Sequence, residues 1–127
     1  MRVLIADDER VLGQALGGMV ERCGHEVAAI VSSGLEAIQA YSRLTPDIVL
    51  MDYKMPRLNG ATACRMILSK DANARVILIS GVASSELLSG TGAVGILQKP
   101  VEMDRLYSAL YDAGSRDATE RDKTLPD

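Results

Sequence analysis

Five short hydrophobic segments recur along the chain: residues 3–6, 27–31, 48–51, 76–79 and the weaker 94–97. Within each segment apolar residues follow one another directly and do not alternate with polar ones. Such continuous apolarity is typical of strands that are covered on both faces of a sheet. The pattern therefore predicts five β-strands in the interior of the protein.

The segments between the strands have the spacing of amphipathic helices. The predicted helices are Val11 to Cys23, Leu35 to Leu44, Asn59 to Lys70 and Met103 to Leu110. Strands that alternate with helices favour parallel pairing, because each connection is long enough for a helical crossover. We therefore predict an α/β fold with a doubly wound five-stranded parallel sheet, strand order 2-1-3-4-5, and helices on both faces.

The amino-acid composition narrows the class of protein and leaves the predicted α/β fold unchanged. The chain has 127 residues, 47% of them hydrophobic, and a net charge of -3, as expected of one globular domain. No apolar run approaches the roughly 18 residues of a membrane span, and no secretory signal follows Met1, so a cytoplasmic location is expected. An acidic chain without Phe or Trp is a poor candidate for direct nucleic-acid binding. We predict a domain over residues 1–114 and a disordered polar tail or linker stub over 115–127.

Polar residues that can carry chemistry follow four of the five strands. Asp7 and Asp8 follow the first strand, Asp52 the third, Ser80 the fourth and Lys99 the fifth. Because all strands of a parallel sheet end at the same edge, these side chains are predicted to meet there. The sequence thus predicts one site built from three carboxylates, a hydroxyl and an ammonium group.

Each residue also has an ordinary structural explanation. Acidic residues before a helix cap its first turn, and Asp, Ser and Lys are common in loops. The combination is harder to explain in this way, because carboxylates about 4 Å apart repel by about 4 kcal/mol at an effective dielectric constant near 20. A cation would relieve that repulsion, and the all-oxygen ligand set favours Mg²⁺ or Mn²⁺ over zinc.

The same residues suggest phosphoryl chemistry. Asp7, Asp8, Asp52 and Lys99 together carry a formal charge of -2, which one divalent ion would neutralise. An aspartate nucleophile could then approach phosphorus, with Lys99 and the Ser80 hydroxyl donating hydrogen bonds to the phosphoryl oxygens.

Four segments resemble the receiver domain of two-component response regulators, the CheY-like phosphoacceptor family, over about residues 2 to 113. They are Val-Leu-Ile-Ala-Asp-Asp-Glu at 3–9, Asp-Ile-Val-Leu-Met-Asp-Tyr-Lys-Met-Pro-Arg-Leu-Asn-Gly at 47–60, Val-Ile-Leu-Ile-Ser-Gly at 76–81 and Gly-Ile-Leu-Gln-Lys-Pro at 95–100. The resemblance implies that Asp52 accepts a phosphoryl group from a sensor kinase's phosphohistidine. It also implies a flavodoxin-like fold.

Further roles follow from the resemblance by position. Asp8 would bind Mg²⁺ directly and Asp7 through water, while the backbone carbonyl of Lys54 would supply another ligand. Lys99 would pair with Asp52 and then with the phosphoryl group, towards which Ser80 would turn its hydroxyl. The Lys99-Pro100 peptide bond would be cis.

The sequence departs from the family at the switch positions, Ser80 and Ile96. Receiver domains usually have an aromatic residue where this chain has Ile96, so the usual coupling between the hydroxyl residue and that ring cannot operate. Only 19 positions separate Ser80 from Lys99, fewer than is usual, and the polar intervening segment predicts a short or irregular fourth helix. Lys54 and Val82 lie where the family tunes access of water, and they predict slow self-dephosphorylation.

The leading hypothesis is a Mg²⁺-dependent phosphoacceptor of two-component signal transduction or a phosphorelay. It would catalyse its own phosphorylation without being a conventional enzyme. Its expected partners are a sensor histidine kinase or phosphotransfer protein and a downstream protein target, without a membrane or direct nucleic acid, and the chain is expected to be a monomer or weak homodimer.

Three alternatives remain open at this point. The chain could be a receiver-like adaptor that works without phosphorylation, or the receiver fragment of a longer regulator whose effector domain is lost. A haloacid-dehalogenase-type phosphatase also uses Asp, Ser or Thr, and Lys on a parallel sheet. Such an enzyme needs a second Asp two residues after the nucleophile, where this chain has Lys54.

Overall fold

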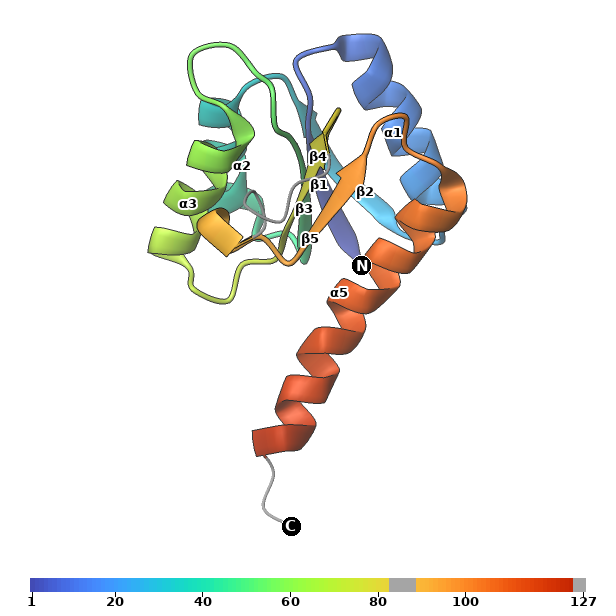
Figure 1. Ribbon diagram of the computed structural model, residues 1–127, viewed down its shortest axis with the longest axis vertical. Helices are drawn as coiled ribbons and strands as arrows, with labels where there is room; N and C mark the ends of the chain where they lie inside the picture. The colour runs from blue at the N-terminus through green and yellow to red at the C-terminus, as the bar shows by residue number, and fades with distance from the viewer. Residues whose placement is uncertain (83–88, 125–127) are drawn as a thin grey trace.

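The computed structural model describes residues 1–82 and 89–124, and its centre is a five-stranded parallel sheet (Figure 1). The strand order is β2-β1-β3-β4-β5, which confirms the predicted order 2-1-3-4-5. The strands are β1 (Arg2–Ala6), β2 (Glu26–Val31), β3 (Ile48–Asp52), β4 (Val76–Ser80) and β5 (Gly95–Gln98). Each starts and ends within one residue of its predicted hydrophobic segment.

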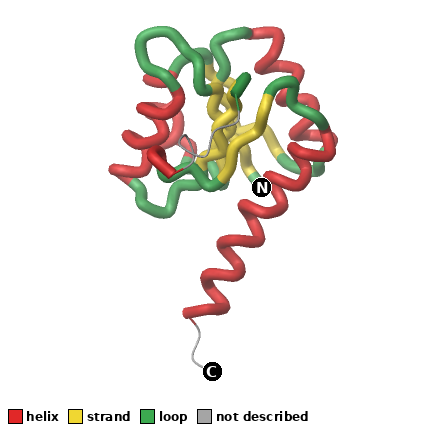
Figure 2. Tube along the Cα trace, viewed as in Figure 1, coloured by secondary structure: helices red, strands yellow, loops and turns green. Residues whose placement is uncertain are grey.

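Helices cover both faces of the sheet, as Figure 2 shows in red against the yellow strands. They are α1 (Arg10–Arg22), α2 (Gly34–Leu44), α3 (Gly60–Lys70) and α5 (Met103–Thr124). Helices α1 and α5 lie on one face, and α2 and α3 lie side by side on the other. No helix within residues 1–82 and 89–124 is long and apolar enough to cross a membrane.

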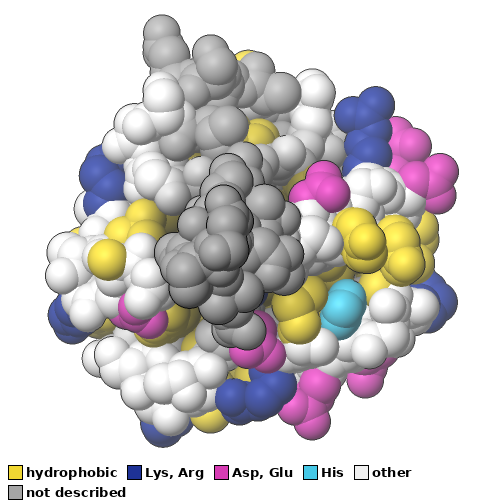
Figure 3. Space-filling model, turned by 90° about the horizontal axis from the view of Figure 1, so that it is seen from below, with side chains coloured by type: hydrophobic (Ala, Val, Ile, Leu, Met, Phe, Trp, Pro, Cys, Tyr) yellow, Lys and Arg dark blue, Asp and Glu magenta, His cyan; other side chains and the backbone are white. Residues whose placement is uncertain are grey.

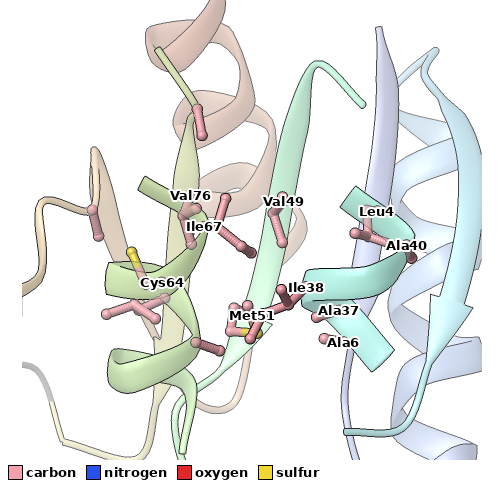
Figure 4. Packing of buried hydrophobic residues seen from close by; sticks show 14 of the residues in the cluster. Leu4, Ala6, Ala37, Ile38, Ala40, Val49, Met51, Cys64, Ile67 and Val76 are labelled. Carbon is pink, nitrogen blue, oxygen red and sulfur yellow. The ribbon is translucent and has the colours of Figure 1, made fainter. Parts of the chain in front are cut away.

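The sheet separates two hydrophobic clusters, because alternate residues of the central strands point to opposite faces. Beneath α2 and α3, Leu4, Val49 and Met51 pack against Ile38 and Ile67, as seen in Figure 4. On the other face the intervening strand residues meet α1 and α5: Val3, Ile5, Ile48, Leu50, Ile77 and Ile79 against Leu16, Val20, Leu106 and Leu110. Every residue of β3 and β4 is buried, which explains their continuous apolarity.

Strand β2 departs from the predicted burial, as does the other edge strand, β5, of which only Leu97 is buried. Strand β2 lies at the edge of the sheet, and its residues are only partly buried or exposed, with Ile30 42% exposed. The apolar run predicts cover on both faces, but a strand at the edge has a neighbouring strand on one side only, so solvent reaches part of it.

The C-terminal segment also differs from the prediction. We expected a disordered tail from Ser115, whereas α5 continues without interruption to Thr124. The segment has no apolar stripe, but its residues include the helix formers Ala118, Glu120, Arg121 and Lys123, and it continues a helix that is already nucleated. Propagation of an existing helix does not require a new hydrophobic face.

The predicted short or irregular fourth helix falls mostly on residues 83–88, which lie outside the described residues. Residues 89–91, which follow them, are helical.

Two of the three glycines in α1 provide a first test of the packing. Gly18 has no atom within 4 Å of where a Cβ would lie, whereas a Cβ on Gly17 would lie 3.1 Å from the Ile30 Cδ1 atom of β2. We expect Gly18→Ala to raise the free energy of unfolding by about 1 kcal/mol, because alanine loses less backbone entropy in a helix.

Gly17→Ala is expected to give a smaller gain or none, since Ile30 must move to admit the methyl group. Urea unfolding of the two variants and the wild type measures this difference. Equal gains would mean that α1 does not rely on Gly17 for its close approach to β2.

Candidate functional site

The parallel sheet delivers the predicted site residues to one edge, where the strands end at the top of Figure 1. Asp52 and Ser80 are the last residues of β3 and β4, Asp7 directly follows β1, and Lys99 directly follows β5. Backbone hydrogen bonds tie these ends together: the Lys99 N–H donates to the Ser80 carbonyl at 2.8 Å, and the Tyr53 N–H donates to the Ile79 carbonyl at 2.8 Å. The sheet register therefore fixes the separation of the functional side chains.

Asp7, Asp8 and Asp52 form an acidic cluster. One carboxylate oxygen from each lies within 4.8 Å of the others. Asp7 and Asp52 are buried, at 6% and 2% exposure, whereas Asp8 is exposed. The cluster is therefore open on the Asp8 side, and a hydrated cation can reach it from solvent.

The donor set fits Mg²⁺. All three side chains offer hard anionic oxygens at a spacing that one small cation can span, and no sulfur or imidazole ligand is part of the group. Mg²⁺ usually keeps several waters and takes one or two carboxylates directly, which suits a cluster with one exposed edge.

Lys99 forms an ion pair with the buried carboxylate. Its Nζ atom lies 3.0 Å from Oδ1 of Asp52. Burial raises the pKa of Asp52, Lys99 opposes this shift, and the charges of Asp7 and Asp8 add to it. Burial alone would lower the pKa of Lys99, but the hydrogen bond and charge of Asp52 outweigh it and raise that pKa. Lys99 is therefore a cation at neutral pH, paired with Asp52 at the edge of the acidic cluster.

Asp7 performs a structural role as well as lining the site. Its Oδ1 atom accepts a hydrogen bond of 2.9 Å from the Glu9 N–H, at the N-cap of α1. This bond closes a turn before the helix and does not cap the first turn of α1, whose N-cap residue makes no side-chain cap bond. The second carboxylate oxygen of Asp7 is not engaged by that bond and is available to the cluster.

Ser80 is buried at 6% exposure beside Asp52. Its Oγ atom accepts a hydrogen bond of 3.1 Å from the Val82 N–H. This bond uses a lone pair of the hydroxyl and leaves its proton to donate elsewhere. Ser80 can therefore donate to an oxygen that arrives above Asp52.

A cavity of about 440 Å³ opens beside Asp52. Its lining combines the predicted Asp52, Lys54, Ser80, Val82 and Lys99 with two residues for which no role was predicted, Tyr53 and Gly81. Both directly follow a strand-end residue, so extending the same rule by one position would have found them.

The remaining predicted residues lie around this centre. Lys54 is exposed at the cavity wall. The Lys99-Pro100 peptide bond is cis, as the resemblance implied. Ile96 lies on β5, partly buried against the cluster under α2 and α3, and lines a larger cavity of about 740 Å³ between β5 and α5.

His25, the only histidine, lies at the opposite end of the molecule. It precedes β2, and Figure 3 shows this end from below, with the histidine beside hydrophobic side chains. Its Nδ1 atom is 3.1 Å from the N-terminal amino group. His25 therefore takes no part in the site at the carboxyl ends of the strands.

Comparison with known proteins agrees with this geometry. Residues 3–111 match the family described as the response regulator receiver domain. The chain is 36% identical to the chemotaxis protein CheY of Thermotoga maritima over 112 residues, covering 86% of this chain and 93% of that protein.

Two solved structures extend the comparison. The response regulator receiver domain protein from Clostridium thermocellum superposes with a TM-score of 0.85 at 28% identity, covering 93% of this chain and 97% of that one. The CheX-CheY-BeF3-Mg²⁺ complex from Borrelia burgdorferi gives 0.81 at 29% identity, covering 87% and 86%. By fold, strand-end residues and sequence, this chain belongs to the response regulator receiver domain family.

Proposed function

We propose that the chain is a Mg²⁺-dependent phosphoacceptor that takes a phosphoryl group onto Asp52 from a sensor histidine kinase or phosphotransfer protein. The observation that carries this proposal is the position of Asp52, which touches Lys99 on one side and the acidic cluster on the other. A carboxylate that served only to cap a turn would need neither neighbour. Residues 1–114 would form the functional receiver unit.

The chain's own residues suit the metal that the family uses. Asp8 and Asp52 would hold Mg²⁺ directly, Asp7 would hold it through water, and the Lys54 carbonyl would complete the protein ligands. Mn²⁺ would fit the same oxygens. When bound, the ion offsets the mutual repulsion of the carboxylates and the negative charge of the incoming phosphoryl group.

The transfer itself uses Asp52 as the nucleophile. One carboxylate oxygen forms a bond to phosphorus as the bond between phosphorus and the donor's imidazole nitrogen breaks, and that nitrogen keeps the electron pair. The Lys99 ammonium group, released from its contact with Asp52, donates to a phosphoryl oxygen, and the Ser80 hydroxyl donates to another. The product is an acyl phosphate within the cavity over β3.

Phosphorylation is proposed to change the protein contacts of the domain. Ser80 lies one strand away from Ile96, since Ser80 pairs with Gln98 and Leu78 with Ile96 in the β4-β5 register. Movement of the Ser80 hydroxyl would act on β5 directly, without the aromatic ring that most receivers have. A downstream protein that reads the surface around β5 would sense the change.

The direct test is incubation with acetyl phosphate, followed by mass spectrometry of the intact protein. The proposal expects a mass increase of one phosphoryl group with Mg²⁺ and none when a chelator removes it. Ile96 motivates a second candidate, an adaptor that binds its partner regardless of phosphorylation. A pull-down in which partner recovery is the same with and without Mg²⁺ and phosphodonor would favour the adaptor.

We expect the phosphorylated protein to lose its phosphoryl group slowly. Lys54 and Val82 line the cavity that an attacking water must enter, and Val82 offers that water no hydrogen bond. Loading with acetyl phosphate, removal of the donor and timed mass spectrometry give the half-life. Val82→Gly should shorten it, because the valine side chain no longer hinders water.

A half-life of seconds in the wild-type protein would contradict this expectation. So would an unchanged half-life in the Val82→Gly variant.

A further inference from the structure

Gly34, the first residue of α2, lies in close contact with the loop that follows Asp52. It is buried, and a Cβ built on it would lie 2.9 Å from the Leu58 carbonyl oxygen, 3.1 Å from Leu58 Cδ2 and 3.3 Å from Ala63 Cβ. The first of these neighbours is backbone, which cannot rotate away as a side chain can. Any larger residue at position 34 must therefore displace the loop or the helix.

Helix α2 itself does not require a glycine at this position. Ser33 is the N-cap, and its Oγ atom accepts a hydrogen bond of 3.1 Å from the Glu36 N–H. The Glu36 carboxylate in turn accepts one of 2.9 Å from the Ser32 N–H. These caps would serve any first-turn residue, and glycine is a weaker helix former than alanine. The close approach to Leu58 is the feature that needs a residue without a side chain.

The loop from 53 to 59 (the β3-α3 loop) is tightly closed. The Gly60 N–H donates to the Tyr53 carbonyl at 2.7 Å, and the Leu58 N–H donates to the Pro56 carbonyl at 2.7 Å. Arg57, between those last two residues, has a φ of 69°, which few residues other than glycine adopt. A hydrogen bond between residues two apart around a residue with positive φ is a γ-turn. Such a turn is strained and persists only when its surroundings hold it in place.

Two glycines hold the loop, Gly60 where the loop meets α3 and Gly34 of α2 near Leu58. A Cβ on Gly60 would overlap the carbonyl of Asp52, so α3 begins in direct contact with the backbone of the acceptor residue. Gly34 holds the middle of the loop at Leu58. Lys54 lies between these contacts, and its neighbour Met55 is buried at 6% exposure. Leu58 is only four positions from Lys54 in this closed loop, so we expect a shift at Leu58 to displace the Lys54 backbone.

We propose that Gly34 is a positioning residue for the metal site: by admitting the Leu58 carbonyl against α2, it holds the backbone carbonyl of Lys54 where Mg²⁺ is bound. This inference rests on the proposed function, because it concerns the same site. Gly34 itself touches neither the metal ligands nor the reacting atoms, and it acts only through the loop.

Gly34→Ala is expected to weaken Mg²⁺ binding about tenfold, the lower end of the loss seen when residues that orient metal ligands are changed. Calorimetric titration of the full chain with MgCl₂ measures the affinity without relying on activity. The rate of phosphorylation by acetyl phosphate should fall at low Mg²⁺ and return to the wild-type rate at saturating Mg²⁺, because Asp52, Lys99 and Ser80 are unchanged. Circular dichroism without Mg²⁺ is needed to show that the variant is folded, because Mg²⁺ would also rescue a partly unfolded protein by binding to its native state.

The matched control is Gly18→Ala, the same substitution at a site with open space, which should leave the Mg²⁺ affinity unchanged. A second comparison sets the Leu58→Ala variant against the double variant that carries both Gly34→Ala and Leu58→Ala. In this pair the contact with the Leu58 side chain is absent, whereas the contact with the Leu58 carbonyl is kept. This relieves part of the crowding, so the pair also serves if the single Gly34 variant does not fold. The double variant should still bind Mg²⁺ about tenfold more weakly than the Leu58→Ala variant.

The outcomes separate the inference from the proposed function. If the wild-type protein does not bind Mg²⁺, the proposed function is wrong. If it binds and Gly34→Ala binds equally well, or if the loss disappears in the Leu58→Ala background, Gly34 does not position the loop through the Leu58 carbonyl and the inference is overturned.

Discussion

Replacement of Asp52 by Asn is expected to abolish phosphorylation by acetyl phosphate while the fold is retained. The amide has nearly the same shape as the carboxylate, but it has no anionic oxygen to form the bond to phosphorus. Mass spectrometry of the intact protein after incubation with Mg²⁺ and the donor should show no added phosphoryl group. Asp104→Asn, at an exposed position in the first turn of α5, is the matched control and should be phosphorylated like the wild type.

Phosphorylation of the Asp52→Asn variant at the wild-type rate would contradict the assignment of the acceptor. The result is informative because Asp7 and Asp8 lie in the same cluster. If either of them were the acceptor, the variant would still gain the phosphoryl group.

Replacement of Lys99 by Met is expected to change metal binding and phosphorylation in opposite directions. Asp7, Asp8, Asp52 and Lys99 carry a net charge of -2, and without the lysine it becomes -3, so Mg²⁺ should bind more tightly. The rate of phosphorylation should fall about 100-fold, because the ammonium group that lies against Asp52 is no longer there to donate to the phosphoryl oxygen. Methionine has a similar length and leaves the surrounding packing largely filled.

Calorimetric titration with MgCl₂ and timed phosphorylation by acetyl phosphate measure the two effects on the same samples. Lys70→Met, at the exposed end of α3, controls for a general loss of positive charge. Weaker Mg²⁺ binding in Lys99→Met would show that Lys99 supports the metal site, and an unchanged phosphorylation rate would remove it from the transfer.

The strands, their order and the site residues could be predicted from the sequence because local rules determine them. Continuous apolar runs indicate buried strands, the helical segments between them require parallel pairing, and parallel pairing brings the strand ends together. The positions of Asp7, Asp52, Ser80 and Lys99 at one edge follow from that reasoning without further information.

Other features depend on contacts between distant segments, and local patterns do not reveal them. The partial exposure of β2 depends on its place at the sheet edge, and the extension of α5 to Thr124 depends on a helix that begins at Met103. The contact between Gly34 and Leu58 joins residues of two different connections. In the sequence, Gly34 is only a glycine after a helix cap.

The most direct test of the central claim is to identify the phosphorylated atom chemically. Borohydride reduces an acyl phosphate of aspartate to homoserine, and peptide mass spectrometry then locates the converted residue. After loading with acetyl phosphate and Mg²⁺, we predict homoserine at position 52 and at no other aspartate. Phosphate retained as a stable ester on Ser80, or homoserine at position 7 or 8, would contradict the account.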